Sequence, residues 1–198
     1  AQSSRVRRRQ ERNRRALLKA ARTLMARHGY HRTTIAAITR AADLGFGTFY
    51  LYFRSKGDIL RALVDQAVKR QTTALDDASR LASSPGEALH RVIELSVDAA
   101  IENRDLFQIV FEHGGERREP FRRLHQALAS ALEGAIERGV RSGEFRQVHP
   151  ALTARAIAGM LPAVLLWAGR SREVSRDTLV AALSQFALRG LTNEEGLS

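Results

Sequence analysis

The stretch TTIAAITRAADLGFGTFYLYFRSKG, residues 33–57, decides the fold of this chain. Thr34 is placed to cap a short helix over 35–42, because a threonine hydroxyl there accepts an otherwise unpaired backbone N–H. An Asp-Leu-Gly turn over 43–45 follows, and then a second short helix over 46–53. Two short helices joined by so small a turn predict a helix-turn-helix, whose second helix usually enters the major groove of DNA.

The net charge of +11 lies around this stretch. Residues 1–60 contain 14 Lys and Arg against 3 Asp and Glu, whereas residues 61–198 contain 18 of each. A basic patch attracts phosphates, although a charge run alone is more often a solvated face. Its coincidence with the helix-turn-helix favours nucleic acid. Residues 1–12, AQSSRVRRRQER, are expected to be a disordered basic arm, which either reaches DNA or only solubilises the chain.

Residues 13–57 are predicted to form a small DNA-binding domain of three helices. The first covers 13–28, with an apolar face of 3.6-residue period and Gly29 as its left-handed stop. In the third helix, Phe49 and Phe53 are four residues apart and are expected to face the core. The predicted DNA-contacting residues are Thr34, Gly45, Phe46, Gly47, Thr48, Tyr50, Tyr52 and Lys56.

The outward residues of the third helix offer chemistry that suits DNA. Gly47 lacks a Cβ, so its backbone can approach a base edge or a sugar. Thr48 offers a hydrogen bond or a methyl group, and Phe46 is expected to meet a thymine methyl. The hydroxyls of Tyr50 and Tyr52 suit phosphates. The competing interpretation, in which aromatic residues are simply core, also applies in part to Tyr50.

Between Arg15 and Leu60 the chain carries the pattern A-A-x-x-L-M-x-x-x-G-Y-x-x-T-T-I-x-x-I and then A-A-D-L-G-F-G-T-F-Y-L-Y-F-x-S-K-x-D-I-L. This stretch resembles the N-terminal domain of the TetR (tetracycline-repressor-like) family of transcriptional regulators. Two positions depart from the family. Asp43 stands where Gly is usual, and Gly45 stands where the family usually has a Ser or Thr whose hydroxyl often contacts a phosphate. Asp tolerates a left-handed turn and Gly is an acceptable N-cap, so the fold is expected to be kept.

Residues 58–198 are predicted to form a helical effector-binding and dimerisation domain, which makes the fold class all-α. Apolar residues recur with helical spacing, and no strand pattern or internal repeat is present in the sequence. A linking helix begins at Lys56, and the resemblance implies that its tilt moves the two heads of a dimer apart. The predicted helices from this point on are 56–81, 85–103, 105–113, 119–142, 150–168 and 177–189.

The last two helices are apolar on more than one face, which requires burial on both sides. The residues concerned are Ala156, Gly159, Ala163, Leu166, Leu179, Ala182, Leu183 and Phe186. The resemblance implies that these helices pair with their twofold mates as a four-helix bundle, so a homodimer is predicted. The alternative is an ordinary core within one chain.

Apolar residues of the second domain predict an effector pocket, since ligand sites are lined mainly by such side chains. The candidate lining residues are Phe107, Val110, Phe111, Leu128, Leu132, Met160, Val164 and Trp167. For each of them the plain alternative is core packing. The basic segment 117–123 is a candidate contact for an anionic effector such as an acyl-CoA, and otherwise a solvated loop and helix start.

Several classes of protein are disfavoured by the sequence. The chain has no cysteine and none of the common hydrolase, nucleotide-binding or zinc-protease motifs, so neither an enzyme nor a cofactor is predicted. His90 and Glu94 lie four residues apart but have no third metal ligand, so a surface ion pair is the better interpretation. No stretch reaches the roughly 18 apolar residues of a membrane span, and no signal peptide is visible, so a cytoplasmic location without membrane contact is expected.

The sequence therefore predicts a sequence-specific, homodimeric DNA-binding regulator. The expected mechanism is that of a repressor released from an inverted-repeat operator by a small hydrophobic or acyl-type effector. Two alternatives remain open: a basic protein that coats DNA without specificity, and a helical small-molecule-binding domain whose positive face is incidental.

Overall fold

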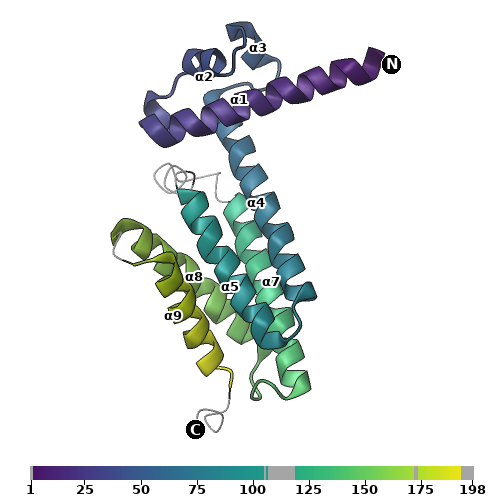
Figure 1. Cartoon of the computed structure of the whole chain (residues 1–198), viewed down its shortest axis with the longest axis vertical. Helices are drawn as coiled ribbons and strands as arrows, with labels where there is room; N and C mark the ends of the chain where they lie inside the picture. Colours follow the sequence, from purple (N-terminus) through teal and green to yellow (C-terminus); the bar gives the residue numbers. More distant parts are fainter. Residues whose placement is uncertain (1, 105, 107–118, 172–173, 193–198) are drawn as a thin grey trace. The chain divides into compact units, whose positions relative to one another are not determined.

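The computed structural model describes residues 2–104, 106, 119–171 and 174–192, and across these residues the regular structure is helical (Figure 1). The chain divides into two compact units. The first contains α1, α2, α3 and the start of α4, and the second contains the rest of α4 with α5, α7, α8 and α9. The helices are α1 (Gln2–Arg32), α2 (Ile35–Ala41), α3 (Phe46–Tyr50), α4 (Lys56–Leu81), α5 (Pro85–Glu102), α7 (Glu119–Ser142), α8 (Pro150–Ser171) and α9 (Arg176–Arg189).

In the first unit, α2 packs against both α1 and α3. Phe49 and Phe53 are buried, which confirms their predicted core role. They join apolar residues of the other helices, because an amphipathic helix is stable only when its apolar stripe is covered. The buried residues of this unit include Leu17, Ala21, Met25, Ile38, Phe49, Phe53, Ile59, Leu60 and Leu63.

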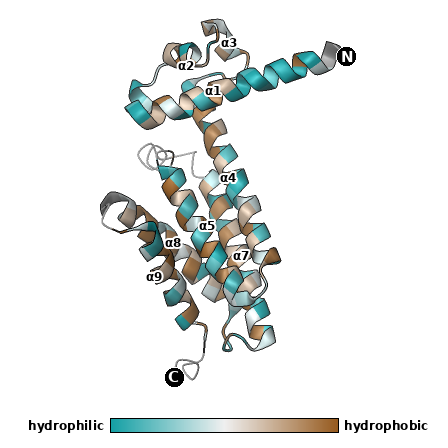
Figure 2. Cartoon of the chain, in the orientation of Figure 1, coloured by the Kyte–Doolittle hydropathy of each residue, from teal (hydrophilic) through white to brown (hydrophobic). Residues whose placement is uncertain are grey.

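The predicted disordered arm is wrong for the described residues, because α1 begins at Gln2. Figure 2 shows that this part of α1 is hydrophilic almost throughout. Arg and Gln are good helix formers, and they extend a helix that the apolar residues after position 16 already hold in place. An i,i+4 ion pair between Glu11 and Arg15, at 3.3 Å, adds to this extension.

Two further helix ends in the first unit differ from the prediction. Gly29 has the expected positive φ, 78°, but helical residues resume beyond this kink as far as Arg32. Helix α3 ends at Tyr50, three residues early. The reason is a tightened turn, in which the amides of Tyr52 and Phe53 both donate to the carbonyl of Phe49 at 3.0 Å.

The second unit is a helical bundle in which α5 packs against α7, α8 and α9, and α7 also packs against α8. Ser84 and Ser175 cap α5 and α9, each accepting a backbone N–H three residues on. Helices α4 and α7 have the predicted bounds, whereas α8 continues to Ser171. Apart from Leu106, the predicted helix 105–113 lies outside the described residues.

Helix α9 is also held to α5 by charge. Arg176, its first residue, donates to Asp98 at 2.6 and 2.9 Å and to Glu94 at 2.9 Å. Asp98 first, and then Glu94, raise the pKa of Arg176 above its ordinary value. The predicted pair of His90 with Glu94 is therefore wrong, since His90 Nδ1 lies 2.9 Å from Ser184 Oγ instead.

Helix α8 is the most apolar of the body helices and only partly buried. The segment Pro150–Gly169 is long and apolar enough to cross a membrane by length and composition, although 28% of it is buried within the chain. The expectation that no stretch reaches such a span is therefore wrong by length and composition, because a span needs only to be predominantly apolar. One face of α8 packs on the bundle through Ala154, Ala158 and Leu161, so α8 is an integral part of a helical core.

Candidate nucleic-acid interface

The turn of the helix-turn-helix is closed by backbone hydrogen bonds and one left-handed residue. The amide of Leu44 donates to the carbonyl of Thr39 at 2.9 Å, and the amide of Asp43 donates to Arg40 at 3.1 Å. Asp43 has φ 55°, as expected for an aspartate in a left-handed turn. Thr34 caps α2 as predicted, because its Oγ1 accepts the amide of Ala37 at 3.1 Å. These contacts fix where α3 begins.

Helix α3 presents two aromatic rings to solvent. Phe46 is 55% exposed and Tyr50 is 52% exposed, and their rings meet edge to face at a centroid distance of 5.7 Å. Beside them, a Cβ added to Gly47 would have no heavy atom within 4 Å, so this side of α3 is open. Solvent-exposed aromatic rings on a five-residue helix contribute little to the core, which leaves recognition of a partner as their best-supported use.

The other predicted contacts lie at or near α3 and differ in accessibility. Thr34 and Gly45 are exposed, whereas Thr48 and Tyr52 are half-buried. Gly45 is the N-cap of α3 with extended backbone, φ −64° and ψ 146°, and it makes no side-chain cap. The structure therefore groups Gly45, Phe46 and Gly47 on an open segment, with Thr48 less accessible.

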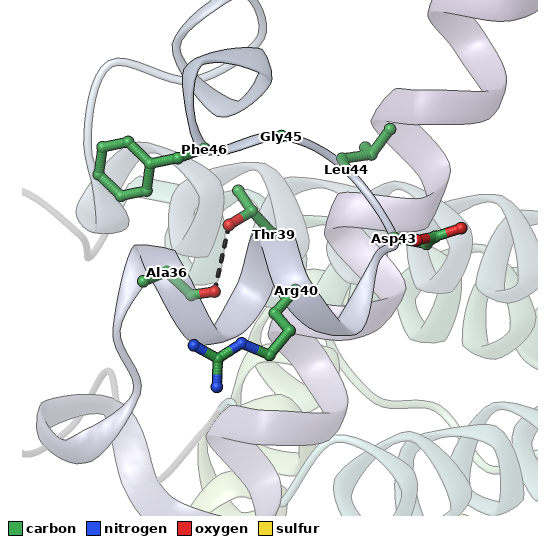
Figure 3. Close-up of a pocket in the computed structure, with 7 residues that line it drawn as sticks. All are labelled: Ala36, Thr39, Arg40, Asp43, Leu44, Gly45 and Phe46. Carbon is green, nitrogen blue, oxygen red and sulfur yellow. Dashed lines mark hydrogen bonds between the residues drawn. The ribbon is translucent and has the colours of Figure 1, made fainter.

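A hollow between α2 and the start of α3 adds one candidate residue, Arg40, to those predicted from the sequence. Its lining residues are Ala36, Thr39, Arg40, Asp43, Leu44, Gly45 and Phe46 (Figure 3). In this view the Arg40 guanidinium and the Phe46 ring extend to the same side, and Asp43 points to the other. The signal was the spacing of Arg40 four residues after Ala36, which places a cation on the outer face of α2.

Lys56 lies in a different setting from the rest of the predicted set. Its Nζ donates to the backbone carbonyls of Tyr30 at 2.8 Å, Thr33 at 3.0 Å and His31 at 3.2 Å. It also lies 4.4 Å from the centre of the Tyr30 ring. Desolvation by burial lowers the pKa of Lys56. All three donor positions of this ammonium therefore have partners inside the protein.

The predicted effector-lining residues are scattered in accessibility. Leu128 and Leu132 are buried in the bundle core, and Met160 and Val164 are half-buried against it. Trp167 is 59% exposed and so does not lie inside that core. Phe107, Val110 and Phe111 lie outside the described residues.

Among the residues that the structure describes, no group of three or more His, Cys, Asp or Glu residues is arranged to hold a metal ion.

Comparison with known proteins agrees with this architecture. Residues 17–63 match the family model of bacterial regulatory proteins of the tetR family, and residues 82–191 match that of the tetracyclin repressor-like C-terminal domain. The uncharacterized HTH-type transcriptional regulator YhgD of Bacillus subtilis is 23% identical over 185 residues, covering 89% of this chain and 95% of YhgD.

Solved structures share the fold. The TetR family transcriptional regulator PfmR from Thermus thermophilus has a TM-score of 0.70 and 28% identity, covering 90% of this chain and all of that one. The transcriptional regulator FadR from Bacillus subtilis, solved in complex with stearoyl-CoA, has a TM-score of 0.71 and 22% identity, covering 88% of this chain and 97% of that one. The two family models together span both units of the structure, and this chain belongs to the TetR family of DNA-binding transcriptional regulators.

Proposed function

We propose that this regulator binds an inverted-repeat operator as a homodimer, represses transcription there, and is released by a small apolar or acyl-type effector. The observation that carries the proposal is the exposed aromatic pair Phe46 and Tyr50 on the second helix of a helix-turn-helix. In such a motif the second helix lies in the major groove, where apolar groups contact thymine methyls.

The proposed DNA-contacting surface is divided by chemistry. Base reading falls to Phe46, Gly47 and Thr48, because they lie on or beside the open side of α3. Phosphate contacts fall to hydroxyl and cationic groups around that helix, which hold the protein in register without reading sequence. The proposed phosphate-contacting residues are Thr34, Tyr50, Tyr52 and Arg40, with the backbone of Gly45.

The proposed dimer contact is the outer face of α8 and α9. Leu152, Trp167 and Phe186 are 67%, 59% and 66% exposed, and exposed apolar patches of this kind mark interaction sites. Two residues of the predicted interface behave differently, because Leu179 and Leu183 are buried within the chain. For Leu179 and Leu183 the alternative of an ordinary intrachain core holds. In the proposed dimer they would pack beneath the contact surface without touching the partner.

The proposed effector is apolar with an anionic end. Support comes from the apolar bundle around Met160 and Val164 and from the fold shared with FadR, a protein solved with stearoyl-CoA. Effector binding would favour a dimer state with the wrong separation of recognition helices, and the shift is limited by the effector's differential affinity for the two states. We place this regulation in the cytoplasm and assign no catalytic step to the protein.

Selection of bound fragments from a random DNA pool at about 0.15 M salt tests the proposal. The expected product is an inverted repeat whose half-site centres lie about one helical turn apart, near 34–36 Å. The Phe46→Ala variant should return a repeat with altered base preference but the same spacing. Strongly salt-dependent binding without a consensus would support a DNA-coating protein, and the absence of binding would support a ligand-binding domain alone.

The effector is tested separately with stearoyl-CoA and free stearate as probes. Either compound should raise the melting temperature of the protein and release the selected DNA duplex, because a ligand that binds only the folded state stabilises it. Failure of both probes to change melting or DNA affinity would remove the acyl-type effector from the proposal.

A further inference from the structure

The ends of the helix-turn-helix are brought to one point by the ammonium group of Lys56. Thr33 directly precedes the helix-turn-helix segment 34–55, and Lys56 directly follows it. Lys56 Nζ donates to the carbonyl of Thr33 at 3.0 Å and to those of Tyr30 and His31 at 2.8 and 3.2 Å. One side chain therefore joins the link before α2 to the link after α3, across 23 to 26 residues of sequence.

The carbonyls that Lys56 meets lie at the C-terminal end of α1 and just beyond it. The final carbonyls of a helix have no partner within the helix, and α1 ends at Arg32. Three carbonyl dipoles pointing at one cation, with the Tyr30 ring beneath it at 4.4 Å, offset the loss of its hydration. A three-donor ammonium on a flexible stem suits convergent single acceptors, whereas the planar fork of arginine suits a carboxylate or a phosphate.

The start of α4 is a poor place for a phosphate. Asp58 lies in its first turn, where its amide donates to Ser55 Oγ at 3.1 Å and its carboxylate accepts the Arg54 amide at 3.0 Å. The N-terminal amides there are partly capped, and a carboxylate is already present. A cation at a helix N-terminus is also disfavoured by the helix dipole, so the placement of Lys56 suggests another role.

We infer that Lys56 is a positioning residue which fixes α2 and α3 on α1 and α4, and is not a phosphate contact. This inference rests on the proposed DNA-binding function and differs from the role that its place in the sequence suggested. We call the contacts of Lys56 Nζ with its three carbonyls the Lys56 clamp. Loss of this clamp loosens both ends of the segment 34–55 together, so the angle at which α3 meets the groove is no longer held.

Substitution by arginine separates the two roles. Lys56→Arg keeps the charge and serves a phosphate equally well, but its planar group cannot serve three separate carbonyls in the same geometry. Lys56→Met removes the charge and keeps a similar length. Arg40→Gln is the matched comparison, because Arg40 is an exposed cation of the same unit.

The measurements are thermal melting and affinity for two duplexes of equal length, the selected repeat and a scrambled sequence, across a salt series below the melting temperature. We expect Lys56→Arg and Lys56→Met alike to lower the melting temperature. Both should lose about tenfold or more in the ratio of repeat to scrambled affinity, the size of a lost charge-assisted hydrogen bond. The slope of log affinity against log salt should stay at its wild-type value. Arg40→Gln should instead make this slope shallower by about 0.9 and leave the ratio unchanged.

The inference is overturned if Lys56→Arg behaves as wild type while Lys56→Met makes the salt slope shallower, which is the signature of a phosphate contact. It is also overturned if both variants have a melting temperature equal to or above that of the wild type. Melting needs no DNA, so it tests the clamp even if the wild-type protein binds no duplex, an outcome that would refute the proposed function alone.

Discussion

Arg40 is the proposed DNA contact that is easiest to test by itself. It is exposed at the end of α2, beside the hollow that includes Phe46. If Arg40 contacts a phosphate, Arg40→Gln weakens binding to every sequence. It also makes the slope of log affinity against log salt shallower by about 0.9, because one fewer counterion is released.

The matched control for Arg40 is Arg70→Gln, which removes the same charge from an exposed position on α4 in the second unit. Its salt slope should equal that of the wild type. Equal slopes for all three proteins in filter-binding titrations would exclude Arg40 as a phosphate contact.

Glu87 gives the stability of α5 a dependence on pH. The Ser83 hydroxyl and then the Ser83 amide, at 2.8 Å, donate to its carboxylate, and Arg91 adds to them, which lowers the pKa of Glu87 to about 2. A carboxyl whose folded pKa lies below its unfolded value stabilises the fold above the unfolded pKa, and this contribution is lost as pH falls. Glu87→Gln should therefore lower the melting temperature at pH 7 and have a shrinking effect between about pH 4.5 and pH 2.

The control for this pH dependence is Glu137→Gln, an exposed position on α7. Its melting temperature should follow that of the wild type across the same range. A constant difference between Glu87→Gln and wild type from neutral to acidic pH would show that the Ser83 contacts do not discriminate the ionised form.

At the scale of helices, α7 contains a glycine whose place is set by a neighbouring ring. A Cβ built on Gly139 would lie 2.1 Å from Cδ2 of Phe145, which is buried. Gly139→Ala should therefore destabilise the protein by about 1–3 kcal/mol, the usual cost of overpacking a core. The measurement is urea unfolding followed by circular dichroism.

Gly134, earlier in α7, is the matched control for Gly139. A Cβ there meets only side-chain atoms at 3.5 Å or more, which is ordinary contact. Gly134→Ala should be neutral or stabilising by up to about 1 kcal/mol, because alanine restricts the unfolded chain more than glycine does. Equal effects at the two positions would mean that Phe145 moves away without cost.

Helices were predictable from sequence where local signals and burial agreed, and not elsewhere. Helix α4 has its predicted bounds because its apolar period runs unbroken from Lys56 to the break before Pro85. The start of α1 was predicted as disordered, since charge suggested disorder while helix propensity favoured extension. Helix α3 ends early because of backbone bonds to one carbonyl that no pattern reveals.

The candidate site divides in the same way. The buried side of α3 was predictable from Phe49, which faces the core as expected, although Phe53 lies beyond the end of this helix. The partners of Lys56 do not follow, because carbonyls 23 to 26 residues away carry no sequence signal. Arg40 was not among the predicted residues, because its place beside Phe46 depends on how α2 and α3 pack together.

For the whole molecule, the exposed apolar residues of α8 and α9 support the proposed dimer. Helix α8 is apolar enough to pass a compositional test for a membrane span, yet Leu152 and Trp167 are mostly exposed. A second copy of the same chain would cover this face and would bring two recognition helices to one operator. Twofold pairing is also the commonest oligomer symmetry, in which each patch contacts its own copy.

Substitution of Phe186, which is 66% exposed on α9, tests this assembly. The wild type is expected to sediment at twice the chain mass. Phe186→Glu should raise the dimer Kd by about 30-fold or more, because an aromatic residue buried at an interface typically contributes over 2 kcal/mol and a carboxylate there lacks a partner.

Leu81→Glu is the control, since Leu81 is 78% exposed at the end of α4 and lies outside the proposed contact. A dimer that Leu81→Glu dissociates and Phe186→Glu leaves intact would place the interface elsewhere. If the dimer does form through α8 and α9, Phe186→Glu should also lose affinity for the inverted repeat while keeping its weak affinity for a single half-site, because the DNA-binding unit itself is untouched.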